Sequence, residues 1–305
     1  MNNKKKAKLQ MMGLKSLLIF MGVSVIGFVV FFVKSVLQYG NYEVYDEGIN
    51  VTYVGLTLLC LVVFVVLVLY FRTSYKKVFV SRLLEFELPG CCYSRYEGFG
   101  QGLIDSSIGL VEPGNKYKSE DYISGNYKGI HFEQADVLIQ NEVREKSRFS
   151  DDTKIKVYKH FKGRMIVMDS PVNVKKPIYI YSYNFDHRYK GQHFTLTSVE
   201  TKDKVFGDVF SVLVSAEGSS VSVLTDKMKN ALLTTYNKFY NMAVRFEDKK
   251  MYIAINTKED CFDWKITRGL NFRKEIETNR NQIYVIKDII DILKGEEKAE
   301  GTDVY

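Results

Sequence analysis

The chain has 305 residues, of which 46% are hydrophobic and 26% are charged, and its formal net charge is +7. Residues 1–71 contribute +3 of this charge, so the remaining 234 residues carry only +4, which excludes the markedly basic domain of a dedicated nucleic-acid-binding protein. Four cysteines without even spacing exclude a disulfide-rich secreted scaffold and fit a reducing compartment.

Two uncharged apolar runs near the N-terminus predict a membrane anchor over residues 1–71. The first, residues 17–33, has thirteen Leu, Ile, Val or Phe among 17 residues, and the second, residues 51–71, has fifteen Leu, Val or Phe among 21. Each run is long enough to cross about 30 Å of hydrocarbon as an α-helix. We therefore expect transmembrane helices at about residues 16–33 and 51–71. The alternative for the first run is a cleaved signal peptide, but residues 35–38 offer no small-x-small cleavage site.

Basic residues flank the two runs on one side of the membrane. The connecting residues 34–50 hold one lysine against three acidic residues. The positive-inside rule therefore predicts a multi-pass membrane protein with cytoplasmic termini and an outward-facing acidic loop. Each basic side chain near an anionic lipid surface contributes about 1 kcal/mol to its attraction. The residues predicted to contact the surface of the lipid bilayer are Lys4, Lys5, Lys6, Lys8, Lys15, Arg72, Lys76, Lys77 and Arg82.

Residues 72–90 are predicted to continue the second helix beyond the membrane. Apolar residues recur there at helical spacing up to Phe86, and Pro89 followed by Gly90 stops the helix at about Glu87. The basic residues between the apolar ones leave two interpretations open. One is a lipid-sensing element, and the other, which we favour, is a topology signal on a helix that packs on its own domain.

Residues 91–294 are predicted to form a cytosolic α+β domain. Alternating apolar and polar residues predict one hairpin pair at 127–132 and 135–140, and a second at 244–246 and 251–255 around a charged turn. Further predicted strands, rich in Val, Ile, Tyr and Phe, cover residues 155–158, 164–168, 178–183 and 210–214.

Two helices are predicted in the second half of this domain. Thr225 caps the first, which runs to about residue 241 with Leu232 on its apolar face. The last helix ends at Gly295 and is followed by a flexible tail, residues 295–305. Strands in runs with helices inserted late predict a mainly antiparallel sheet. The apolar faces are formed by Met228, Leu232, Tyr236 and Phe239 in the first helix, and by Ile283, Ile286, Ile290 and Leu293 in the last.

The sequence indicates no catalytic residue, cofactor or metal site. Cys91 and Cys92 are adjacent but lack the second pair that would complete a metal site. Residues 98–102 lack the third glycine of a phosphate loop, and residues 218–222 lack the second glycine of GxSxG, so both are predicted to be loops. The histidines form no HExxH or paired CxxC arrangement and are predicted to be surface residues: His131, His160, His187 and His193.

Several segments in a fixed order carry a resemblance to a known family. The more specific ones are Ser119-Glu120-Asp121-Tyr122-Ile123-Ser124-Gly125 and Tyr127-x-Gly129-Ile130-x-Phe132, and Phe161-Lys162-Gly163-Arg164 and Met251-Tyr252-Ile253-Ala254-Ile255 follow. Over residues 75–265 the chain resembles the bacterial family known as domain of unknown function 3137. The resemblance implies two N-terminal membrane spans, a cytosolic domain and a bacterial inner or plasma membrane. It also implies partners of the LemA type, which are coiled-coil membrane proteins, and it transfers no catalytic residue.

These observations predict a membrane-tethered cytosolic binding or scaffold protein without enzymatic activity, which acts as a homo-oligomer or with another membrane protein. Two alternatives stay open. The first is a membrane-bound hydrolase with carboxylates near Asp121 and a histidine such as His131, which a cleft gathering these groups would favour. The second is a module that binds a lipid headgroup near residues 72–82, which a basic pocket facing the bilayer would favour.

Overall fold

The computed structural model describes residues 3–40, 51–146, 153–188, 196–215, 223–263 and 272–295. Two compact units make up the chain. The first, here called the N-terminal unit, comprises Met1–Arg82 and Asp263–Gly269. The second, here called the sheet unit, comprises Leu83–Phe262 and Leu270–Tyr305.

Two long helices form most of the N-terminal unit. Helix α1 spans Asn3–Gly40 and helix α2 spans Val51–Glu87, so α2 ends where the sequence predicts. Each helix contains a segment that is long and apolar enough to cross a membrane, Met12–Leu37 in α1 and Thr52–Glu87 in α2. The two helices are in contact, because the Ser24 hydroxyl of α1 donates a hydrogen bond of 2.8 Å to the Cys60 carbonyl of α2. The acidic connection predicted between them falls largely on residues 41–50, outside the described residues.

The sheet unit is built on one antiparallel sheet. Its strands lie in the order β1-β2-β3-β4-β6-β5, and β7 pairs with β4. Every strand pair is antiparallel, as the sequence predicts. The strands are β1 (Cys92–Ser94), β2 (Lys116–Tyr127), β3 (Ile130–Lys146), β4 (Thr153–Ser182), β5 (Leu196–Val199), β6 (Phe210–Ser215) and β7 (Met242–Ile255).

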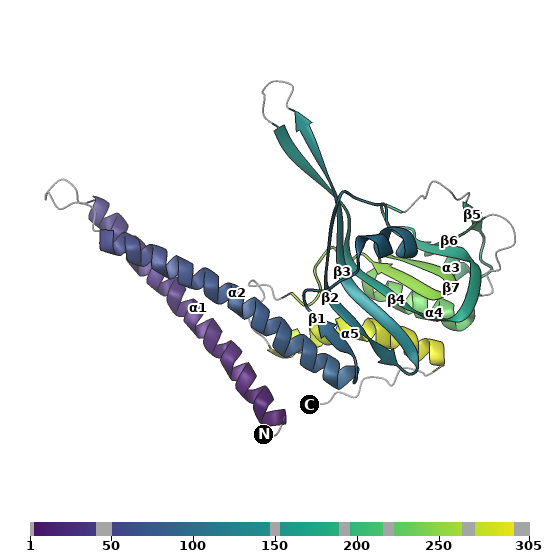
Figure 1. Cartoon of the computed structure of the whole chain (residues 1–305), viewed down its shortest axis with the longest axis horizontal. Coiled ribbons are helices and arrows are strands. Elements are labelled where there is room, and N and C mark those ends of the chain that lie inside the picture. The colour runs from purple at the N-terminus through teal and green to yellow at the C-terminus, as the bar shows by residue number, and fades with distance from the viewer. Residues whose placement is uncertain are drawn as a thin grey trace. The chain divides into compact units, whose positions relative to one another are not determined.

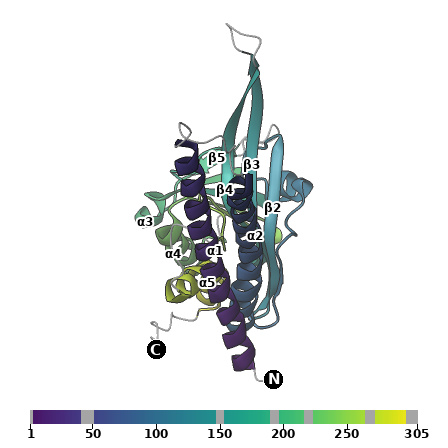
Figure 2. The same ribbon diagram turned by 90° about the vertical axis from the view of Figure 1, so that its left-hand side faces the viewer.

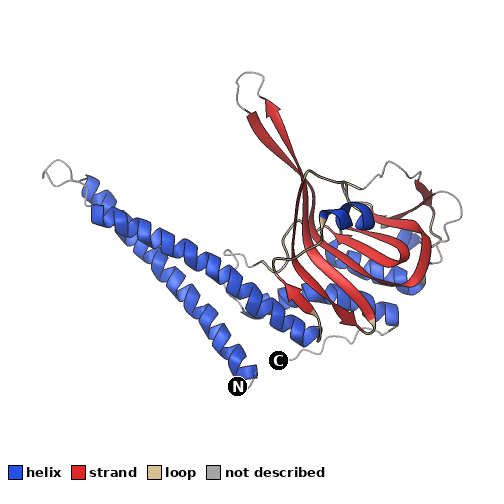
Figure 3. Cartoon of the chain, viewed as in Figure 1, coloured by secondary structure: helices blue, strands red, loops and turns tan. Residues whose placement is uncertain are grey.

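Helices cover both faces of this sheet. Helices α4 (Asp226–Phe239) and α5 (Phe272–Lys294) pack against each other on one face (Figures 1 and 3). The π-helix η1 (Leu103–Ile108) contributes Ile104 and Ile108 to the hydrophobic core on the other face, and α3 (Lys204–Gly207) is a single turn before β6. The α+β fold predicted from the sequence is thus confirmed.

The two predicted helices are confirmed with their apolar faces. The Thr225 hydroxyl accepts a hydrogen bond of 3.3 Å from the Met228 N–H and so caps α4, whose Leu232 is fully buried. Helix α5 ends at Lys294, and Gly295 follows in a left-handed conformation with φ +80°, which glycine adopts without strain. Burial of an apolar stripe against the sheet stabilises both helices more than their intrinsic propensity does.

The first predicted hairpin is wrong in its boundaries. Residues 127–132 do not form one strand, because Lys128 and Gly129 both have positive φ, +48° and +78°, and make the turn between β2 and β3. A two-residue turn with two positive φ angles matches the twist of antiparallel strands. The apolar residues on either side of this turn gave the appearance of continuous alternation.

The sequence also divides two continuous strands, β4 and β7, into shorter predicted strands, and these divisions are wrong. Residues 155–158, 164–168 and 178–182 all belong to the 30-residue β4, which passes Pro171 and Pro177 through irregularities in its register with β7. A bulge lets a strand accommodate proline, which cannot donate a ladder hydrogen bond. Likewise β7 runs through its charged residues 247–250 without reversing, and Asp248, with φ +51°, lies at the irregularity opposite Val174.

The β3–β4 hairpin extends beyond the rest of the sheet. Residues 141–146 of β3 and 153–158 of β4 pair with each other, whereas the β2 pairing ends at Gln140 and the β7 pairing begins at Arg164. We call this two-stranded extension the arm, and it projects from the sheet in both views (Figures 1 and 2). At its base the Asn115 carboxamide donates to the Glu142 carbonyl and accepts from the Glu142 N–H, each at 2.8 Å.

Candidate functional site

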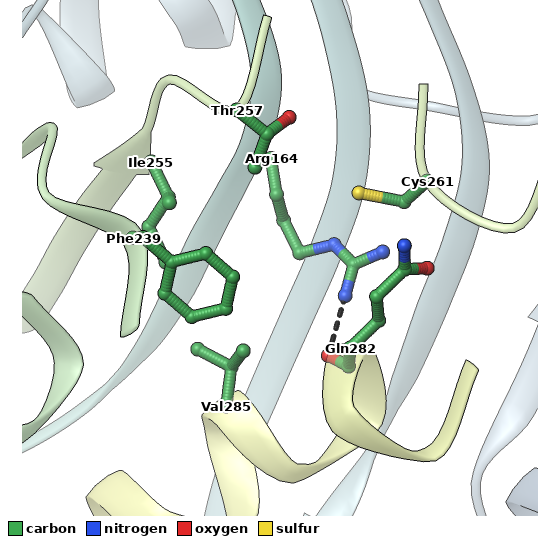
Figure 4. Close-up of a pocket in the computed structure, with 7 residues that line it drawn as sticks. All are labelled: Arg164, Phe239, Ile255, Thr257, Cys261, Gln282 and Val285. Carbon is green, nitrogen blue, oxygen red and sulfur yellow. Dashed lines mark hydrogen bonds between the residues drawn. The ribbon is translucent and has the colours of Figure 1, made fainter. Parts of the chain in front are cut away.

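A buried ion pair lies between the sheet and α5. Asp136 of β3 and Arg164 of β4 are directly opposite each other, and the Arg164 Nε is 3.5 Å from the Asp136 Oδ1. Both side chains are almost fully buried, at 5% and 3% exposure. The guanidinium also donates a hydrogen bond of 2.7 Å to the Gln282 carbonyl of α5 (Figure 4). It stacks over the Phe262 ring at 4.7 Å. The pair therefore ties two strands to the helix that covers them.

A small cavity adjoins this ion pair. Its volume is about 50 Å³, which is room for a few water molecules and far less than the several hundred cubic ångströms of a typical substrate pocket. Among the described residues, the Arg164 Nη2 and the carboxamide of fully buried Gln134 make no hydrogen bond. Because buried polar groups need partners, water in the cavity would stabilise Arg164. The lining residues are Arg164, Phe239, Ile255, Thr257, Cys261, Gln282 and Val285 (Figure 4).

Burial of the ionisable groups near this cavity disfavours nucleophilic chemistry there. Burial raises the pKa of the Cys261 thiol well above its usual value, although the Arg164 charge opposes this shift. The thiolate is the reactive form of cysteine, so this shift lowers the nucleophilicity of Cys261. Burial also raises the pKa of Asp136 to about 6, again opposed by Arg164. The cavity therefore lies beside a structural ion pair and has room for water next to Arg164.

The motif that begins at Ser119 has a structural function. The Ser119 hydroxyl accepts a hydrogen bond from the Phe99 N–H and donates one to the Asp136 carbonyl, each at 2.9 Å. A Cβ atom on Gly98 would lie 2.3 Å from the Ser119 Oγ, so only glycine fits there. Gly98 and Phe99 are therefore held against β2 by close contacts with Ser119.

The carboxylate proposed for the hydrolase alternative is engaged elsewhere. Asp121 is 1% exposed and accepts a hydrogen bond of 2.6 Å from the Tyr93 hydroxyl. Burial, followed by the Asp121 charge, raises the pKa of Tyr93. The His131 ring lies 3.4 Å from a carboxylate oxygen of Glu133, and the His131 backbone N–H donates to the Asp169 carboxylate at 3.4 Å. None of the hydrogen bonds found among the described residues links Asp121 with His131.

A second cluster brings two histidines and a carboxylate together on the sheet unit. The His187 Nδ1 lies 3.4 Å from a carboxylate oxygen of Glu112, and the His160 Nδ1 lies 3.2 Å from the Glu112 backbone carbonyl. The two imidazole rings stack with their centroids 4.6 Å apart. Sequence spacing could not indicate this cluster, because its residues come from three separate segments. His160 is 8% exposed and is therefore not the surface residue that the sequence predicts, and His193 is outside the described residues.

The residues predicted to contact the membrane surface have different environments. Lys15, Arg72 and Lys77 are exposed, whereas Lys76 is 4% exposed and forms an ion pair of 2.8 Å with Asp263 of the same unit. Membrane contact by these residues stays a prediction. The other members are Arg82, which is half-buried, and Lys4, Lys5, Lys6 and Lys8, which lie in the first turns of α1 and whose side chains are outside the described set.

The adjacent cysteines also differ from each other. Cys92 is exposed, and Cys91 is half-buried beside Gly125, where an added Cβ atom would lie 2.3 Å from the Cys91 Sγ. Burial and then the neighbouring Cys92 raise the pKa of Cys91, which lowers its thiolate fraction. Glycine at position 125, the last residue of the Ser119 motif, thus makes room for this side chain.

Comparison with known proteins places part of the chain in a family. Residues 153–294 match the family described as "Protein of unknown function (DUF3137)". This segment belongs to that family. The match runs from the first residue of β4 to the last residue of α5, and it confirms the family that the sequence motifs predict. The motif that begins at Ser119 lies before the matched segment.

No curated protein matches the chain. Among solved structures, the chain is similar to the mycobacterial trehalose monomycolate transport factor A, TtfA, at 10% sequence identity and a TM-score of 0.31. The alignment covers 75% of this chain and 96% of that one. A likeness this weak carries no argument about function.

Proposed function

We propose that this chain is a membrane-tethered binding or scaffold protein whose cytosolic sheet unit holds a partner through the arm. The arm carries the proposal. It exposes apolar side chains on a two-stranded ribbon, where a soluble protein would place polar ones: Ile155 is 59% exposed, and Val157 and Tyr158 are each 48% exposed. Contiguous exposed apolar side chains commonly mark a protein-interaction surface.

The backbone of the arm supports the same function. A two-stranded ribbon is only marginally stable in water without a third strand or a packed face. Among the described residues, 141–146 and 153–158 form strand pairs only with each other, so beyond Glu142, whose backbone bonds to Asn115, the outer edges offer backbone N–H and C=O groups. An extended segment of a partner can add to such an edge by backbone hydrogen bonds, while side-chain pockets provide specificity. The partner would be a second copy of the chain or another membrane protein, such as one of the LemA type.

The arm can be tested by photo-crosslinking in cells. Tyr158 replaced by p-benzoylphenylalanine should give a discrete crosslinked adduct, because the new ring occupies the exposed position of the tyrosine ring. Tyr183 is the matched control, since it is 61% exposed but lies outside the arm. An adduct of twice the chain mass identifies a homo-oligomer, and an adduct of another mass identifies a second membrane protein. Absence of an adduct at Tyr158, or the same adduct from both positions, would contradict the proposal.

The tether requires a defined membrane topology. Two helices are long and apolar enough to cross a membrane, and nine basic residues flank them on one side against a single lysine in the connection. A reporter that is active only outside the cell should therefore work when inserted near Gly40 and fail when fused after Tyr305. The opposite pattern would place the sheet unit outside the cell and overturn the cytosolic assignment.

A further inference from the structure

The cluster of Glu112, His160 and His187 is assembled by the backbone of the sheet unit. Val111 forms an isolated antiparallel bridge with Arg188, and the Glu112 N–H donates a hydrogen bond of 2.8 Å to the His187 carbonyl. This pairing holds the segment after η1 beside the segment after β4. His160 reaches the same place from within β4. His160 and His187, which are 48 and 75 positions from Glu112 in the sequence, are thereby held next to it.

The donor set and spacing fit a transition metal. Each of the three residues offers one ligand atom, and these atoms all lie within 4.8 Å of one another. In a tetrahedral zinc site, with bonds of about 2.0–2.2 Å, the ligand atoms are about 3.3–3.6 Å apart. The 3.4 Å between the His187 Nδ1 and the Glu112 Oε2 already has this length. Two imidazoles with one carboxylate suit Zn²⁺ better than Mg²⁺ or Ca²⁺, which prefer oxygen ligands.

The hydrogen bond of His160 prepares its other ring nitrogen for a metal. When the Nδ1–H donates to the Glu112 carbonyl at 3.2 Å, the Nε2 carries the free lone pair. Metal-binding histidines usually donate their second nitrogen to a carbonyl or carboxylate in this way, which fixes the tautomer and the ring orientation. His160 is buried and so provides the rigid part of the cluster.

The other two side chains supply the movement that binding requires. The two imidazole planes are only 14° from parallel, so their in-plane lone pairs do not converge in the stacked arrangement. His187, at 41% exposure, and Glu112, at 55%, have room to turn toward the His160 Nε2. His187 also has a left-handed backbone with φ +52°, a conformation that is uncommon for non-glycine residues and recurs at ligand-binding positions.

We propose that Glu112, His160 and His187 bind one divalent transition-metal ion, with Zn²⁺ as the best fit. Three protein ligands leave the fourth tetrahedral position open to water or to an anionic group of a bound molecule. The proposal goes beyond the binding function proposed above, because it involves no residue of the arm. Either proposal can therefore fail without the other.

The chain contains a matched control for this site. His131 and Glu133 also face each other at 3.4 Å, with 40% and 35% exposure, but no third ligand joins them among the clusters of the described residues. A lone His–Glu pair should bind Zn²⁺ far more weakly than a three-ligand site. Comparison of the two pairs separates a built site from the general affinity of exposed histidines for metals.

The test is a Zn²⁺ titration by calorimetry of the full chain in detergent, purified without a polyhistidine tag and stripped with chelator. We expect one equivalent to bind, and Glu112→Gln and His187→Gln to weaken binding at least about 10-fold. His131→Gln should leave the affinity unchanged. Absorption of bound Co²⁺ gives an independent readout, and its tetrahedral bands should disappear in the same two variants.

Both deciding variants change exposed side chains, so their folding should match that of the wild type in circular dichroism. His160→Gln should also abolish binding, but this buried variant is interpreted only if it folds. The proposal is overturned if the wild type shows no saturable binding of one equivalent, or if Glu112→Gln binds as tightly as the wild type. It is equally overturned if His131→Gln weakens binding as much as Glu112→Gln.

Discussion

Replacement of Asp136 by asparagine should change how the stability of the sheet unit depends on pH. Burial raises the pKa of this carboxyl group from 3.8 to about 6, and the Arg164 charge opposes the shift. Between these two pH values the folded chain binds more protons than the unfolded chain. The free energy of unfolding therefore falls as the pH rises through this window, and the loss is complete above about pH 6.

The size of the effect follows from the two pKa values. A tenfold change in a protonation equilibrium corresponds to 1.36 kcal/mol, so the interval from 3.8 to about 6 corresponds to about 3 kcal/mol. The carboxamide of the Asp136→Asn variant would not titrate, so that variant should lack this slope between pH 4 and pH 6.

The measurement is denaturant unfolding of the detergent-solubilised chain at pH 4, 5, 6 and 7, followed by circular dichroism. Asp169→Asn is the control. The pKa of Asp169 is lowered, chiefly by the hydrogen bond from Lys250, so its stabilising contribution is lost only as the pH falls below 3.8. That variant should keep the wild-type slope between pH 4 and 6. If Asp136→Asn also keeps this slope, the Asp136 carboxyl group does not have a raised pKa in the folded chain.

Three substitutions test the packing of the sheet unit. Leu232→Ala should lower the free energy of unfolding by about 2–5 kcal/mol in urea titrations, because the side chain is fully buried. A loss below about 0.5 kcal/mol would mean that this face of α4 is exposed. Thr225→Ala should cost about 1 kcal/mol by removing the cap of α4, whereas Thr225→Asp should retain it, and equal stabilities would refute the cap. Gly163→Ala would place a Cβ atom 2.1 Å from the Ile255 carbonyl oxygen, so we expect the free energy of unfolding to fall by about 1–3 kcal/mol. An unchanged melting temperature would show that β4 and β7 can move apart at this point without cost.

Local signals were sufficient for the features that depend on neighbouring residues. Thr225 before an apolar stripe and Gly295 after another determined where α4 begins and α5 ends, because capping acts within one helical turn. Pro89 and Gly90 determined the end of α2 in the same way. The strand predictions were wrong where the local pattern was misleading. Lys128 and Gly129 form a turn within an alternating apolar and polar pattern, whereas the charged residues 247–250 lie within the continuous strand β7.

The sequence by itself determined the class of fold, the two apolar helices and the family, because composition, hydrophobic periodicity and ordered motifs are properties of the linear chain. Only the tertiary structure decided which polar groups meet. Asp136 and Arg164 are paired by strand register, and Glu112, His160 and His187 are gathered by a backbone bridge between separate segments. Sequence separation carries no information about such contacts. The arm is likewise a tertiary feature, because its exposed Ile155 and Val157 have the composition of core strands, and only the absence of neighbouring strands among the described residues leaves them uncovered.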